Sequence, residues 1–281
     1  MQPYSNSGSP DASRPEDRLP EDVTYLRTMI SNVVMIGVPG SGSWVLVDTG
    51  MPGSASKIMK AARERFGSEK PLAILLTHGH FDHTGSIQDL MELFPDLPVY
   101  AHELEIPFLT GKADYPPGDP TVGGGLMAAS APLYPNKSID LGARVQPLPQ
   151  DGSVPFLPGW HWLHTPGHSE GHISLFRSLD GTLVAGDAFI TVKQESALAV
   201  LTQRREIHGP PTYFTPNWEA ARTSVARLAA LRPASAVTGH GEPMAGAELN
   251  EGLERLHHDF DRLAVPASGR YVDSAHIDPE A

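Results

Sequence analysis

One short segment, LTHGHFDHTG at residues 76–85, restricts the chain more than any other part of it. It places His78, His80, Asp82 and His83 within six positions. The first two alternate as they would at the end of a strand, and the next two follow in a turn into a helix, so that all four can point at one place. A catalytic zinc site uses about three protein ligands and keeps a position for water, so four ligands fill one metal site or begin two. Taken alone, a polar turn with unrelated histidines remains the other interpretation.

Three later segments repeat the same local form, in which a strand runs into a glycine-containing turn that carries a potential ligand. They place His168 in TPGHSEGH, Asp187 in VAGDAF and His240 in VTGHGEP. Each alone could be a hydrogen-bonded histidine or a turn-forming aspartate. Together with the first segment they make seven candidates, which suits two metal ions about 3.5–4 Å apart with one carboxylate bridging them.

Composition limits what such a centre can be and what it can act on. The chain has 281 residues and no cysteine, so any metal site must be built from His, Asp and Glu. Its net charge of −12 disfavours nucleic acid as a partner and leaves a small-molecule substrate. Residues 1–20 are rich in Ser, Pro and Asp and predict a flexible tail without a secretory signal. We expect a cytoplasmic protein without membrane contact, and a homodimer is left open.

The hydrophobic pattern predicts a single α/β domain over residues 21–281, with two sheets facing each other and helices outside. Adjacent antiparallel strands are expected around residues 23–29, 32–38 and 43–48, and further strands around 72–77, 98–102, 159–166, 172–178, 181–187 and 234–241. Helices are expected over residues 54–67, 84–94, 217–232 and 246–264. Residues 110–140 are dense in Gly and Pro and predict an inserted lid or pocket wall.

The ordered motifs resemble those of the metallo-β-lactamase superfamily. THGHFDHTG, TPGHSEGH, AGD and TGHG follow VLVDTG in the family's order, from about Val33 to Met244. The resemblance implies a four-layer αββα sandwich of two mixed β-sheets flanked by helices. It also implies that His78, His80 and His168 bind one metal, that Asp82, His83 and His240 bind the second, and that Asp187 bridges them. Asp48 would support the site from behind, and His172 would pack beside it.

The resemblance further implies a hydrolase in which a metal-bridging hydroxide cleaves a small ester, lactone, thioester or amide, with Asp82 orienting the water. Two divalent ions are expected, zinc first, with iron and manganese as alternatives. The other readings are an iron-dependent oxygenase, a β-lactam-hydrolysing relative and a non-catalytic metal-binding relative.

Asp187 and the segment after it favour one group of branches of the family but match none of these branches fully. A bridging aspartate is typical of glyoxalase II thioesterases and N-acyl-homoserine lactonases, and the lack of cysteine excludes the β-lactamases that use a cysteine ligand. However, GDAFITVKQESALAV replaces the glutathione-binding segment of glyoxalase II, and Ile190 stands where familiar lactonases have tyrosine. The aromatic residues are assigned no role, since such side chains are more often core; they are Phe81, Tyr134, Trp160, Phe189 and Tyr213.

Overall fold

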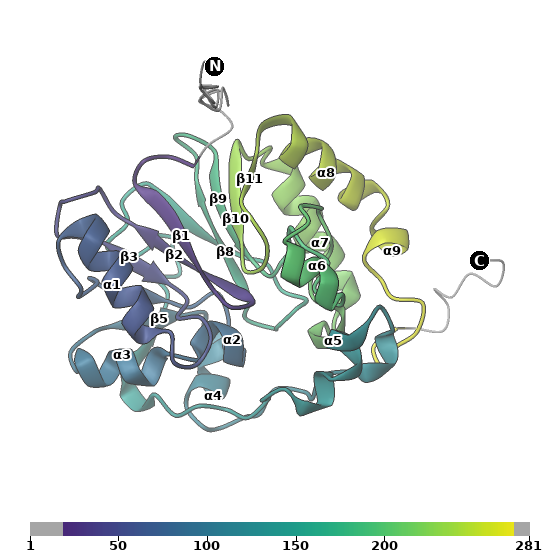
Figure 1. Ribbon diagram of the computed structural model, residues 1–281, viewed down its shortest axis with the longest axis horizontal. Coiled ribbons are helices and arrows are strands. Elements are labelled where there is room, and N and C mark those ends of the chain that lie inside the picture. Colours follow the sequence, from purple (N-terminus) through teal and green to yellow (C-terminus); the bar gives the residue numbers. More distant parts are fainter. Residues whose placement is uncertain (1–18, 273–281) are drawn as a thin grey trace, which may run out of the picture.

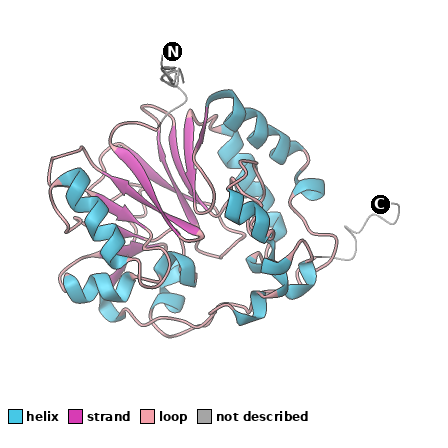
Figure 2. Ribbon diagram, viewed as in Figure 1, coloured by secondary structure: helices cyan, strands magenta, loops and turns pink. Residues whose placement is uncertain are grey.

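The computed structural model describes residues 19–272, so the tail predicted over residues 1–20 lies outside the described residues except for its last two. Within this range, the strands form a six-stranded and a five-stranded sheet that face each other between two groups of helices (Figure 1). Both sheets are mixed, and helices cover only their outer faces (Figure 2). The predicted four-layer αββα sandwich is therefore confirmed.

The first sheet has the strand order β1-β2-β3-β4-β5-β6. Its first three strands pair antiparallel, as predicted, and the strands from β3 to β6 pair parallel. The strands are β1 (Val23–Thr28), β2 (Ser31–Ile36), β3 (Val45–Val47), β4 (Ile74–Leu75), β5 (Val99–Ala101) and β6 (Val145–Pro147). The edge strand β6 was not predicted from the sequence.

The second sheet has the strand order β11-β10-β9-β8-β7. Strands β9 and β10 are parallel, and the remaining neighbours are antiparallel. The strands are β7 (Trp160–His164), β8 (Ile173–Arg177), β9 (Thr182–Gly186), β10 (Ser235–Thr238) and β11 (Met244–Ala245).

The helices lie outside the sheets, where the amphipathic segments predicted them. Against the first sheet lie α1 (Ala55–Phe66) and α3 (Ile87–Leu93), and against the second lie α7 (Trp218–Ala230), α8 (Gly246–His258) and α9 (Phe260–Leu263). The remaining helices are short: α2 (Phe81–Thr84), α4 (Ile106–Leu109), α5 (Leu126–Ala129) and α6 (Ala197–Thr202). No helix of the described residues combines the length and the apolar character that crossing a bilayer needs.

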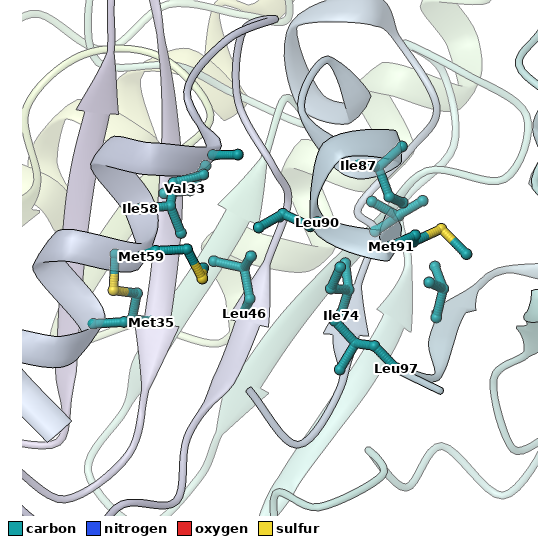
Figure 3. Packing of buried hydrophobic residues seen from close by; sticks show 14 of the residues in the cluster. Val33, Met35, Leu46, Ile58, Met59, Ile74, Ile87, Leu90, Met91 and Leu97 are labelled. Carbon is teal, nitrogen blue, oxygen red and sulfur yellow. The ribbon is translucent and has the colours of Figure 1, made fainter. Parts of the chain in front are cut away.

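Successive side chains of the buried strands point to opposite faces of the sheet, and this alternation produces the layers. In β2, Val33 and Met35 pack against α1, whereas Val34 and Ile36 point toward the second sheet. Figure 3 shows the outer of these two clusters, in which Val33, Met35 and Leu46 meet Ile58 and Met59 of α1. Because a strand presents successive side chains to opposite faces, six consecutive buried residues can serve two cores at once.

Several predicted elements are shorter than expected, and two of them show a structural reason for it. The helix predicted over residues 84–94 is divided because Gly85 N–H donates to the Gly50 carbonyl (2.9 Å) instead of continuing α2. The strand predicted over residues 72–77 contains only Ile74–Leu75, and Thr77 N–H donates to the Asp48 carboxylate (2.8 Å) rather than to a neighbouring strand. The last predicted helix is interrupted at Asp259, where φ is −107°.

A stacked aromatic pair provides a test of the outer core. Trp44 and Phe66 have ring centroids 5.2 Å apart and 7° from parallel, and both side chains are at most 1% exposed. We expect Phe66→Ala to lower the free energy of unfolding by about 3–5 kcal/mol, because it leaves a cavity and removes the stacking contact. Urea unfolding followed by circular dichroism measures this loss. Leu179→Ala, at a side chain 91% exposed, is the control and should change the free energy by less than about 0.5 kcal/mol.

Candidate metal centre

The seven candidate ligands lie together, although they come from four separate parts of the chain. His78 and His80 follow β4, Asp82 and His83 belong to α2, and His168 lies between β7 and β8. Asp187 directly follows β9, and His240 follows β10 after Gly239. All seven are at most 7% exposed. Their ligand atoms form three groups with members within 4.8 Å of one another: His78, His80 and His168; His78, His83 and Asp187; and Asp82, His83 and His240.

The first group, which we call the three-histidine group, consists of His78, His80 and His168. His80 Nδ1 lies 2.9 Å from His168 Nε2, and the His78 and His80 rings meet edge to face. Burial and the neighbouring imidazoles lower the pKa of all three side chains, that of His80 to about 3. These imidazoles are therefore uncharged at neutral pH, which is the state that binds a metal ion.

The second group, which we call the aspartate group, consists of Asp82, His83 and His240. His240 Nε2 lies 3.4 Å and His83 Nε2 3.8 Å from an Asp82 carboxylate oxygen. Burial alone would lower the pKa of both histidines. The surrounding carboxylates, Asp187 first, instead raise it, and that of His83 rises well above its ordinary value. A raised pKa favours the protonated imidazole, whose positive charge offsets that of the buried carboxylates.

Asp187 lies between the two groups. Its carboxylate oxygens are 3.5 Å from His168 Nε2, 3.0 Å from His240 Nε2 and 3.5 Å from His83 Nε2. Burial raises the pKa of this carboxyl, but the imidazoles of His240 and His83 outweigh it and hold the pKa well below its usual range. Only glycine fits at position 239, because a Cβ there would lie 1.8 Å from Asp187 Oδ1. The carboxylate thus lies within 3.5 Å of histidines from both groups.

The donor atoms fit divalent cations. Histidine nitrogens that point away from the centre make hydrogen bonds, whereas several atoms that point into it have no hydrogen-bond partner. His83 Nδ1 bonds Asp48 (2.8 Å), His240 Nδ1 bonds the Ile30 carbonyl (2.7 Å) and His78 Nδ1 bonds Thr77 Oγ1 (3.0 Å). His78 Nε2, His83 Nε2 and Asp187 Oδ1 are buried without any hydrogen-bond partner. Leaving three such atoms unpaired is costly unless a cation takes them, and an engaged outer nitrogen is typical of metal-bound histidine.

Two residues outside the ligand set hold the centre in place. Asp48 adopts a φ of 59°, which is uncommon for a residue with a side chain, and its carboxylate accepts hydrogen bonds from Thr77 and His83. His172 Nε2 accepts the Asp187 backbone N–H (2.8 Å), and its Nδ1 contacts Thr165. Both residues thus contact the candidate ligands from outside the centre, in the positions that the resemblance to the family implies.

Glu105 is a functional candidate that the sequence did not reveal. Its side chain is 0% exposed, and its carboxylate accepts hydrogen bonds from Gly79, Tyr115, Ser169 and Gly171. Burial raises the pKa of this carboxyl, and the four hydrogen bonds oppose that shift. No local motif marks the residue, because its partners lie 10 to 66 positions away in the chain.

A cavity of about 230 Å³ adjoins the centre on the side of the three-histidine group. His80 and His168 form its inner end, and Phe108, Tyr115, Tyr213 and Phe214 line its walls. Tyr115, Pro116 and Pro117 come from the segment predicted as a lid or pocket wall. Phe81, Tyr134 and Tyr213 border the narrow cavity around the ligands, whereas Trp160 and Phe189 lie in the core. A larger surface hollow of about 730 Å³ contains none of the seven candidate ligands.

Comparison with known proteins places the chain in a family. A family model described as the metallo-beta-lactamase superfamily matches residues 26–240. YflN of Bacillus subtilis, a probable metallo-hydrolase, is 52% identical over 233 residues, covering 82% of this chain and 88% of its own. The crystal structure of TTHA1623 in a di-iron-bound form is 28% identical, with a TM-score of 0.51, and covers 79% of this chain and 93% of its own. BLEG-1, a B3 metallo-beta-lactamase, is 23% identical with a TM-score of 0.59, covering 85% and 98%.

The unequal protonation of the two groups predicts proton release on metal binding. The raised pKa values of His83 and His240 favour the protonated imidazoles, whose protons a metal ion must displace, whereas the lowered pKa values of the three-histidine group favour its uncharged form. We expect zinc binding near pH 7 to release about one to two protons per chain, and affinity at the aspartate group to increase with pH. Isothermal titration calorimetry in buffers of different ionisation enthalpy measures this release. Binding heats independent of the buffer would contradict the assignment, and His240→Ala should reduce the release.

Proposed function

The chain belongs to the metallo-β-lactamase superfamily, and on that premise we propose that it is a dinuclear metal-dependent hydrolase of small, uncharged esters and lactones. Thioesters and amides remain within the same chemistry. The observation that carries the proposal is the convergence of seven buried ligands with three inner atoms lacking any partner. Two ligand groups that share a carboxylate suit two metal ions rather than one.

The residues of the centre have separable tasks in this proposal. Two divalent ions, when bound, supply a water acidic enough to act as nucleophile at neutral pH and polarise the scissile carbonyl. Asp187 lies between the groups and would set their spacing. Asp82 borders the narrow cavity and would orient the attacking water by accepting its hydrogen bond. Tyr213 borders both cavities, and because burial raises its pKa well above its usual value, its phenol keeps the proton and can donate to the substrate.

The adjoining cavity supports an uncharged substrate. Among the described residues that line it none is Lys or Arg, and its charged members, Asp114 and Glu170, are acidic. The nearby guanidinium of Arg270 bonds the Pro117 carbonyl at the rim (3.4 Å). A carboxylate held against these walls, away from the metal ions, would lose its hydration without gaining a cationic partner, which is unfavourable. Glutathione thioesters and β-lactams both carry carboxylates, so neutral esters and lactones with an apolar substituent fit better.

Zinc is the metal we propose, because it binds well to imidazole nitrogens and carboxylate oxygens. Iron is the alternative, and the di-iron form of TTHA1623 supports keeping it. Oxygen consumption by the iron-loaded protein would favour an oxygenase instead. The partner in either case is a small molecule, and the net charge of −12 argues against nucleic acid.

A substrate panel on the zinc-loaded protein tests the proposal. We expect neutral 4-nitrophenyl esters and γ-lactones to be hydrolysed, with kcat/KM for hexanoyl esters about tenfold or more above that for the matching ω-carboxylate half-esters. Metal removal by a chelator should abolish turnover, and added zinc should restore it.

Two variants separate the centre from trace contaminants. Asp82→Ala should lower kcat by about a hundredfold or more, because it removes both a ligand and the group that orients water. His161→Ala, at an exposed histidine of β7, is the control and should keep the wild-type rate. A zinc-loaded protein that turned over no ester, lactone, thioester or β-lactam would overturn the proposal.

A further inference from the structure

We infer that Glu105 is a positioning residue that clamps together the two loops of the three-histidine group and leaves the aspartate group unaffected. The inference rests on the dinuclear centre proposed above. Glu105 ends the short 3₁₀ helix Glu103–Glu105 that follows β5, and its side chain is completely buried.

Each carboxylate oxygen of Glu105 holds a different ligand loop. Oε2 accepts the Gly79 N–H (3.0 Å) and the Tyr115 hydroxyl, and Gly79 is the residue between His78 and His80. Oε1 accepts the Ser169 hydroxyl (2.6 Å) and the Gly171 N–H (3.0 Å), next to His168. One carboxylate thus spans the two loops whose histidines must meet at one metal ion.

The backbone around Glu105 is shaped for this close approach. A Cβ at Gly79 would lie 2.4 Å from the Tyr115 hydroxyl oxygen, and a Cβ at Gly171 would lie 2.8 Å from Glu105 Cγ. Any larger residue at either position would push its loop away from the carboxylate. The glycines of HGH and SEGH therefore have a structural purpose that the ligand motif alone does not explain.

The aspartate group is held by different partners. Ser31 Oγ donates to the Asp82 carbonyl (2.6 Å), Asp48 binds His83, and His240 binds the Ile30 carbonyl. None of these contacts involves Glu105, Tyr115 or Ser169. A change at Glu105 should consequently affect one metal ion more than the other.

Glu105→Gln is the sharpest change, because it keeps the shape and removes one acceptor. The hydroxyls of Tyr115 and Ser169 can rotate to accept a hydrogen bond, but the N–H groups of Gly79 and Gly171 can only donate. Whichever way the amide of glutamine is turned, its NH₂ faces one of these two N–H groups. That N–H then loses its bond to residue 105. The Gly79 N–H would keep the Tyr115 hydroxyl oxygen as an acceptor (3.0 Å), so the ligand loop concerned is held less firmly and its histidines are positioned less exactly.

The test is metal binding by the full-length protein, measured without reference to activity. Zinc content after dialysis against graded chelator, and cobalt(II) absorption spectra, should show two ions in the wild type. In Glu105→Gln we expect one ion to bind about 10–100-fold more weakly and the other with unchanged affinity. His240→Ala should weaken the opposite ion, which assigns each ion to its group.

Two further variants exclude a general loss of structure. Glu195→Gln changes another buried glutamate, which accepts hydrogen bonds from Thr212 N–H (3.0 Å) and Oγ1 (2.9 Å) and none from a ligand loop, so it should leave both affinities unchanged. Ser169→Ala removes one hydrogen bond of the clamp and should weaken the same ion as Glu105→Gln, but less. It serves as the test if Glu105→Gln does not fold.

The outcomes are distinct for the clamp and for the proposed function. Equal weakening of both ions, or unchanged affinities in both Glu105→Gln and Ser169→Ala, would overturn the role of Glu105. A wild type that binds two zinc ions but hydrolyses nothing would overturn the proposed function, while the metal affinities would still decide the role of Glu105.

Discussion

The structure depends on one electrostatic constraint, which is the burial of negative charge where the ends of several strands meet. The carboxylates of Asp48, Asp82 and Asp187 are all at most 7% exposed, and they surround imidazoles that are themselves buried. Burying a charge without an oppositely charged or hydrogen-bonding partner costs a large free energy of desolvation. The carboxylates raise the pKa values of His83 and His240 and so favour a proton on each imidazole, and divalent ions would offset the same negative charge more fully.

The sheet topology explains how so many ligands reach one place. Strands β3 and β4 are parallel neighbours in the first sheet, and Asp48 and His78 follow their carboxyl ends. Strands β9 and β10 are parallel neighbours in the second sheet, and Asp187 and His240 follow theirs. Because parallel strands end at the same edge, each sheet delivers its groups side by side. Because the two sheets face each other, the groups from the first sheet and those from the second meet at a common centre.

The candidate ligands could be located from the sequence because each has a local signature, whereas the residues that support them could not. A strand, a glycine and then His or Asp can be recognised within a few residues, as at Gly239 and His240. Glu105 has no such signature, since its role depends on hydrogen bonds to residues up to 66 positions away in the chain. The division of the helix predicted over residues 84–94 likewise arises from a distant contact, between Gly85 and Gly50. The edge strand β6 was missed because three residues ending in Pro147 carry no detectable period.

The two ligand groups differ in charge, and this difference bears on the chemistry the centre can perform. The three-histidine group is neutral, while the aspartate group contains a carboxylate, and Asp187 lies beside histidines of both groups. Two divalent ions would thus meet two carboxylates and five neutral imidazoles, leaving a net positive charge in a buried site. Such a site stabilises negative charge that develops during attack on a carbonyl. Among the described residues that line the adjoining cavity none is Lys or Arg, so the attraction for negative charge would be confined to the place where the bond breaks.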